Sequence, residues 1–192
     1  AELNLAPEAE TLQGARSSLE SLRGVSAERI LAELEKGFAC IAGPVMIRLP
    51  EEIGVHGRLF PSATRGAGGD AASIAAHLPQ PMGLAMGLLL FVDPNPLGAS
   101  PRSERSAQVL SALKAQRPSR QIRRESASIW SLCCELEAYA SEDVDQGQLR
   151  LWMREEAWEG GLQLARACSL TRGESGSRWR EWQAERSLLT RE

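Results

Sequence analysis

The stretch Pro81-Met-Gly-Leu-Ala-Met-Gly-Leu-Leu-Leu-Phe-Val92 carries no formal charge. It contains seven large apolar side chains in addition to Val92. Burying one such side chain is worth roughly 1.5–3 kcal/mol, so hiding all of them contributes about 12–24 kcal/mol as an upper bound. The net stability of a typical domain is only about 5–15 kcal/mol. The fold therefore has to cover this stretch.

A membrane offers one way to cover it. The uncharged run extends back to Ala71 if the intervening histidine is neutral, which gives 22 residues, and about 20 suffice to cross a bilayer. Two prolines interrupt the run, and its flanks are Asp70 and Asp93 rather than Lys or Arg. The compact part, Gly83–Val92, is only ten residues long. This length favours a strand or short helix covered by protein, and 71–92 in or against lipid is the alternative.

Size and charge bound the class of protein. A chain of 192 residues can bury a real core, and we expect one structural domain with extensions. The net charge of −3 gives no electrostatic case for general nucleic-acid binding, so no nucleic-acid partner is expected. The four cysteines lack C-x2-C spacing, and no secretory signal is evident. We therefore expect the four cysteines to be buried free thiols: Cys40, Cys133, Cys134 and Cys168. This favours a reducing intracellular compartment or an organelle interior over secretion, and the sequence does not identify the compartment.

Charge density divides the chain into three parts. Residues 1–36 hold 11 charges, 37–100 only 7, and 101–192 hold 29. The middle part also contains 10 of the 17 glycines and 7 of the 10 prolines. This pattern predicts an N-terminal helical arm, an apolar Gly/Pro-rich centre with many turns, and a C-terminal helical region.

The expected fold class is mainly α, with amphipathic helices at both ends around the short centre and possible minor β. Ser26 and Ser119 are in position to cap helices. One long helix is predicted from about Asp145 through Trp158, continuing past Gly160-Gly161 to Leu170. Within the centre, three short apolar runs are typical of strands: Phe38–Ala42, Val45–Leu49 and Val55–Phe60.

A glycine-rich loop raises the possibility of a nucleotide site. Residues Gly66 to Ala71 match G-x-G-x-x-A, a helix pattern follows, and Asp93 comes later. Such a site needs a strand directly before the first glycine, and Pro61 argues against one there. An Ala/Gly-rich connector is therefore favoured. The weak candidates for cofactor binding are Gly66, Gly68, Gly69 and Asp93.

No catalytic or metal-binding constellation stands out. The chain has no P-loop and no G-x-S-x-G nucleophile motif. His56 and His77 are the only histidines, and neither has further metal ligands at suitable spacing nearby. We expect both at turns or on the surface, and we predict no catalytic residue, metal or cofactor.

Two features predict contact with a partner. Arginines gather at the start of the helix capped by Ser119, where positive charge opposes the helix dipole, so an acidic partner, a phosphate or a lipid headgroup could bind. Arg120 and Arg124 lie opposite the apolar stripe that runs from Ile122 to Ile129, so a solvated face is predicted for them. All five tryptophans lie in the last third of the chain, and tryptophan is enriched at interface hot spots. The predicted partner-binding residues are Trp179, Trp182, Leu189, Arg120 and Arg124. The sequence Arg123-Arg124-Glu125-Ser126 also resembles a basophilic phosphorylation sequence, as many chance tetrapeptides do.

Together these features favour a non-catalytic accessory or scaffolding subunit of a larger assembly, docking on other protein subunits through amphipathic helices and tryptophan anchors. Apolar stripes occur on nearly every predicted helix, so we expect neighbouring chains to cover part of them. One alternative is a membrane-associated subunit of an organellar complex. The other is a small nucleotide-binding protein or enzyme that uses the loop Gly66–Gly69. We recognise no family from these residues.

Overall fold

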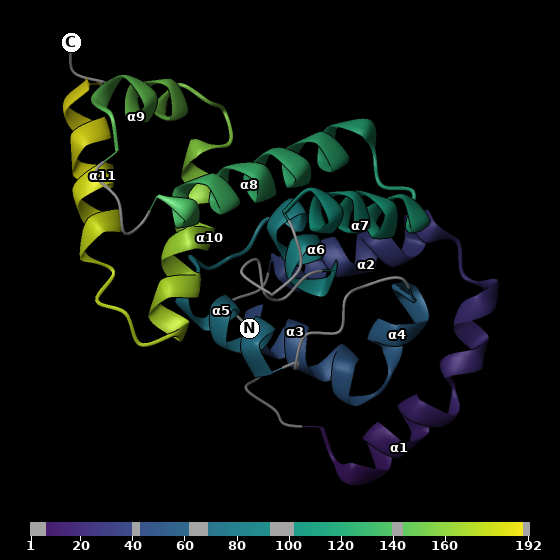
Figure 1. Ribbon diagram of the computed structural model, residues 1–192. Coiled ribbons are helices and arrows are strands. Elements are labelled where there is room, and N and C mark those ends of the chain that lie inside the picture. Colours follow the sequence, from purple (N-terminus) through teal and green to yellow (C-terminus); the bar gives the residue numbers. More distant parts are fainter. Residues whose placement is uncertain (1–6, 40–42, 62–68, 93–101, 140–143, 190–192) are drawn as a thin grey trace.

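The computed structural model describes residues 7–39, 43–61, 69–92, 102–139 and 144–189 (Figure 1). Within these ranges the chain is mainly helical and contains no strand, so the mainly α class is confirmed and the possible minor β is wrong. The elements are α1 (Ala9–Ser17), the 3-10 helix η1 (Leu19–Gly24), α2 (Ala27–Phe38), α3 (Gly43–Glu52), α4 (Val55–Leu59), α5 (Gly69–His77), α6 (Leu84–Val92), α7 (Arg102–Ala115), α8 (Arg120–Ala138), α9 (Gln146–Met153), α10 (Trp158–Thr171) and α11 (Ser177–Leu189).

The apolar runs predicted as strands belong to helices. Val45–Leu49 lies in α3, Val55–Phe60 is largely in α4, and Phe38 is the last residue of α2, while residues 40–42 lie outside the described ranges. A short apolar run cannot be assigned to strand or helix by its periodicity alone. Whether such a run forms a helix or a strand depends on which of its side chains the rest of the fold buries.

Helix α3 shows why the prediction failed. Pro44 occupies the first turn of the helix, where the missing N–H of proline is not needed. Gly43 and Ile47, four residues apart, are buried, whereas Val45 between them is 44% exposed. Burial thus follows the helical period rather than the alternation of a strand.

Helix α6 lies at the centre of the molecule and packs against α2, α3, α5, α7 and α8 (Figure 1). Every residue from Ala85 to Val92 is buried, and none from Leu88 to Val92 is more than 2% exposed. A helix that is apolar on all sides needs cover on all sides, and here the protein supplies it. The expectation of a protein-covered element is confirmed. None of the described helices has the length and apolar character needed to span a membrane.

Helix α2 approaches α6 at a glycine. A Cβ atom on Gly87 would lie 2.4 Å from a ring carbon of Phe38, whose side chain is fully buried. The same ring meets Phe91 edge-on, with the centroids 5.6 Å apart. The Phe38 carbonyl also accepts a hydrogen bond from the Met82 N–H at 2.9 Å. The absence of a side chain at Gly87 is what lets these two helices come so close.

Glycines also bring α8 and α10 together. A Cβ on Gly160 would lie 2.8 Å from Ile129, and one on Gly161 would lie 2.9 Å from Leu132. Both glycines therefore sit inside α10 against α8. The single long helix predicted from Asp145 is instead α9 and α10, separated by a break at residues 154–157.

The two serines predicted to cap helices do so in the structure. The Ser119 hydroxyl accepts a hydrogen bond from the Ile122 N–H at 3.2 Å, and Ser26 does the same for the Arg29 N–H at 3.4 Å. Both predicted caps are confirmed. The helices enclose one hydrophobic core that takes residues from all three charge-defined parts of the chain, among them Leu34, Leu88 and Trp182.

Candidate functional site

The predicted tryptophan anchors face the core of their own chain. Trp179 is 3% exposed and Trp182 is 6% exposed, and their rings meet edge-on with centroids 5.3 Å apart. The Trp179 indole N–H donates to the Ser169 hydroxyl at 2.9 Å. Leu189 ends α11, and its side chain lies outside the described structure. The expectation that these indoles need another chain to cover them is therefore wrong, because α11 packs them inward.

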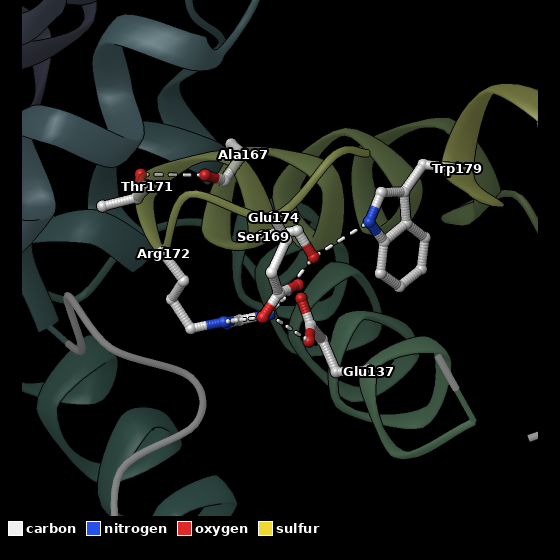
Figure 2. Close-up of polar contacts among 7 residues, drawn as sticks. All are labelled: Glu137, Ala167, Ser169, Thr171, Arg172, Glu174 and Trp179. Atoms are coloured by element: carbon white, nitrogen blue, oxygen red, sulfur yellow. Dashed lines mark hydrogen bonds and ion pairs between the residues drawn. The ribbon is translucent and has the colours of Figure 1, made fainter. Parts of the chain in front are cut away.

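A polar cluster surrounds Arg172, at the end of α10 (Figure 2). The guanidinium pairs with Glu137 of α8 at 2.9 Å and with Glu174 of the following loop at 2.7 Å. It also donates to the Ser169 hydroxyl at 3.1 Å, which is the group that receives the Trp179 N–H. The cluster thus connects the ends of α8 and α10 to the start of α11.

Glu137 is the unusual member of this cluster. Its side chain is only 3% exposed, and burial raises its pKa to about 7 even though Arg172 acts in the opposite direction. One of its oxygens, Oε1, is buried without a hydrogen-bond partner. Glu174 lies at the surface, and its hydrogen bond from Arg172 lowers the pKa of that carboxyl. An acid with a pKa near neutrality can serve catalysis, but structural ion-pair networks also shift pKa values. The described partners of Glu137 are protein groups that join helices, so we assign this cluster to stability.

Sequence reasoning missed this cluster. Glu137 follows Cys133 by four residues and so falls beside the apolar stripe of α8, which was the available signal of a buried acid. Nothing in the sequence indicated that Arg172, 35 residues away, would meet it.

Three cysteines, Cys133, Cys134 and Cys168, are free thiols and are buried, as predicted, while Cys40 lies outside the described residues. Burial raises the pKa of the Cys133 thiol well above its ordinary value, and a hydrogen bond with Cys168 raises it further. The thiolate is the reactive form, so these conditions make the sulfur unreactive.

We expect the three thiols to resist modification in the folded protein. In a Cys40→Ser background, a thiol-reactive disulfide reagent should label them at least about a thousandfold more slowly than in urea, because labelling requires unfolding that costs about 5 kcal/mol or more. Absorbance of the released thiolate measures both rates. Rapid labelling of even one thiol without denaturant would contradict the described burial.

The arginines at the start of α8 are exposed. Arg117, Arg120 and Arg124 lie on the surface, and Arg123 is half-buried with its Nε enclosed and without a hydrogen-bond partner. The solvated face predicted for Arg120 and Arg124 is confirmed. Ser126, in contrast, is fully buried and donates to the Ala85 carbonyl of α6 at 3.2 Å.

The other candidate residues do not form a described site. Gly66, Gly68 and Asp93 lie outside the described residues, and Gly69 is the first residue of α5. His77 is exposed, but His56 is half-buried and stacks on Phe91 with centroids 5.7 Å apart, so its assignment to a turn or the surface is wrong. Among the described His, Cys, Asp and Glu residues, no three come together in a way that could hold a metal ion.

Comparison of the chain with family models, with curated proteins and with solved structures finds no match.

Proposed function

We propose that this chain is a non-catalytic accessory subunit that binds an acidic surface of another protein through the arginine-bearing start of α8. We define this arginine face as Lys114, Arg117, Arg120, Arg123 and Arg124. The observation that carries the proposal is that five basic residues and a single acidic one fall between positions 114 and 125, in a chain whose net charge is −3.

The arginine face differs from the paired arginines elsewhere in the molecule. Arg16, Arg58 and Arg172 each pair with a carboxylate of the chain itself. No member of the arginine face forms an ion pair with another described residue, and four of the five side chains are exposed: Lys114, Arg117, Arg120 and Arg124. Fields of one sign steer association with surfaces of opposite charge.

Local energetics favour an anion at this face. Cations near a helix start oppose the positive end of the helix dipole, typically by about 0.3–1 kcal/mol each. A carboxylate-rich surface would relieve the unfavourable interaction with the helix dipole, and guanidinium groups bind carboxylates through paired hydrogen bonds.

Charge reversal tests the proposal. In quantitative affinity purification from the source cells, the Arg120→Glu/Arg124→Glu variant should recover bound acidic proteins at least about tenfold less than the wild type. Binding of the recovered partner should then be remeasured with purified proteins, where we expect the affinity to fall as salt rises.

The matched control is Arg150→Glu/Arg154→Glu. These two arginines are also exposed and four residues apart, at the end of α9, and should tolerate reversal with no loss of binding. Equal losses in both variants would contradict the proposal. So would wild-type binding to phosphatidylserine vesicles combined with no protein partner, because the arginine face would then serve lipid.

The alternative of a nucleotide site at Gly66–Gly69 stays a prediction. Most of that loop lies outside the described residues, so no described geometry supports it.

A further inference from the structure

A cleft of about 410 Å³ opens between η1, the start of α2 and α4. Pockets that hold small molecules typically measure about 300–1,000 Å³. The cleft lies apart from the Arg172 cluster, which belongs to α8, α10 and α11. It draws its walls from segments that are distant in sequence, including residues 22–30 and 57–61.

The walls of the cleft are largely aliphatic. Leu22 and Val25 come from the segment before α2, and Ala27 and Ile30 come from α2 itself. All four are half-buried, so they retain apolar surface that the protein leaves uncovered. Leu59 of α4, which is 7% exposed, faces them. A ligand with an apolar portion would gain roughly 25 cal/mol for each Å² of this surface that it covers.

Two arginines line the same cleft. Arg23 Nε lies 3.0 Å from Glu20 Oε2, and Arg58 reaches the same oxygen at 3.1 Å. Two guanidinium groups thus share one carboxylate oxygen, which leaves a net positive charge beside the cleft. None of the described lining residues carries a carboxylate. The first residue of α2, Ala27, is also part of the lining, so the positive end of this helix dipole adds to the field.

Gln116 holds the wall of the cleft in place. It is 8% exposed, and its amide donates a hydrogen bond to the Leu59 carbonyl. This contact ties the residue after α7 to the last residue of α4, and both residues line the cleft. The apolar wall is therefore supported by a buried polar contact between segments 57 residues apart.

We propose that this cleft binds a small carboxylate with an aliphatic tail. The tail lies on the wall formed by Leu22, Ile30 and Leu59, and the carboxylate takes the second bonding edge of Arg23 and Arg58. A neutral molecule would leave the excess positive charge unmatched, and a small inorganic anion would leave the apolar wall uncovered. This ligand site is independent of the proposed docking through the arginine face.

Isothermal titration with decanoate tests the proposal. The wild-type chain should bind one decanoate with a Kd below about 1 mM, while decanol and acetate should each bind at least tenfold more weakly. The Arg23→Gln/Arg58→Gln variant should lose at least tenfold in affinity. Arg29→Gln is the matched control, since this exposed arginine of α2 does not line the cleft and its loss should leave the Kd unchanged.

A second variant keeps the test decisive if the double variant misfolds by circular dichroism. Glu20→Gln removes the competing carboxylate and should tighten decanoate binding. Failure of the wild type to bind decanoate at 1 mM would overturn the proposal, as would equal affinity for decanol or an unchanged Kd in both charge variants. Decyl phosphate binding more than tenfold tighter than decanoate would overturn the assignment to carboxylates.

Discussion

Replacing Phe38 by alanine is expected to lower the free energy of unfolding by about 3–5 kcal/mol. The side chain is fully buried between α2 and α6, and it contacts Phe91 as well as the backbone at Gly87. Removing it leaves a cavity beside α6, the helix that the rest of the fold surrounds. The remaining wall is helix backbone and other core side chains, which can collapse only in part.

Urea unfolding followed by tryptophan fluorescence measures this loss. The control is Leu188→Ala, because Leu188 is 66% exposed and its replacement should change the free energy of unfolding by no more than about 0.5 kcal/mol. Phe38→Leu, which keeps much of the volume, should fall between the two. A loss below 1 kcal/mol for Phe38→Ala would mean that the ring does not occupy the described contact.

The Glu137→Gln variant is expected to gain stability relative to the wild type as the pH rises. Burial raises the folded-state pKa of Glu137 to about 7, above the ordinary value near 4.5. Between these two pH values the folded protein holds a proton on Glu137 that the unfolded chain has released. The contribution of Glu137 to the free energy of unfolding is therefore fully present below about pH 4.5 and is lost as the pH rises through 7. The loss is on the order of 2–3 kcal/mol. Glutamine is neutral at every pH, so the variant does not lose this stability as the pH rises.

Denaturant unfolding of both proteins at pH 5 and pH 8 gives the comparison. The free energy of unfolding of Glu137→Gln, relative to that of the wild type, should be higher at pH 8 than at pH 5. Glu174→Gln is the control, because Arg172 lowers the pKa of the Glu174 carboxyl and the stability from that pair is lost as the pH falls. That loss occurs below about pH 4.5, so the difference between Glu174→Gln and the wild type should stay nearly constant between pH 5 and pH 8. Parallel pH profiles for wild type and Glu137→Gln would show that Glu137 stays ionised in the fold.

Much of the fold could be predicted from local pattern. The capping serines Ser26 and Ser119, the amphipathic stripe of α8 and the burial of Leu88–Val92 all follow from residues within a few positions of one another. The three predicted strands failed because each run is only about five residues long. For α3, the deciding contact is the burial of Gly43 and Ile47 by other helices, which no local pattern reports.

The candidate sites could be predicted only in part. The exposure of Arg120 and Arg124 followed from their place opposite the apolar stripe of α8. The inward orientation of Trp179 and Trp182 did not, because an indole on an amphipathic helix can serve an interface or a core equally well. The cleft was not predictable, since its arginines and its aliphatic wall meet only when η1, α2 and α4 are packed together.

The position of Ser126 has a consequence for regulation. Its hydroxyl is buried between α8 and α6 and donates a hydrogen bond to the Ala85 carbonyl, although Arg124, two residues before it, is exposed. A protein kinase could reach that oxygen only after α8 had separated from the central helix. A phosphate found there would therefore mark chains modified before folding or while unfolded, and it would act as a barrier to the native state rather than as a reversible signal on it.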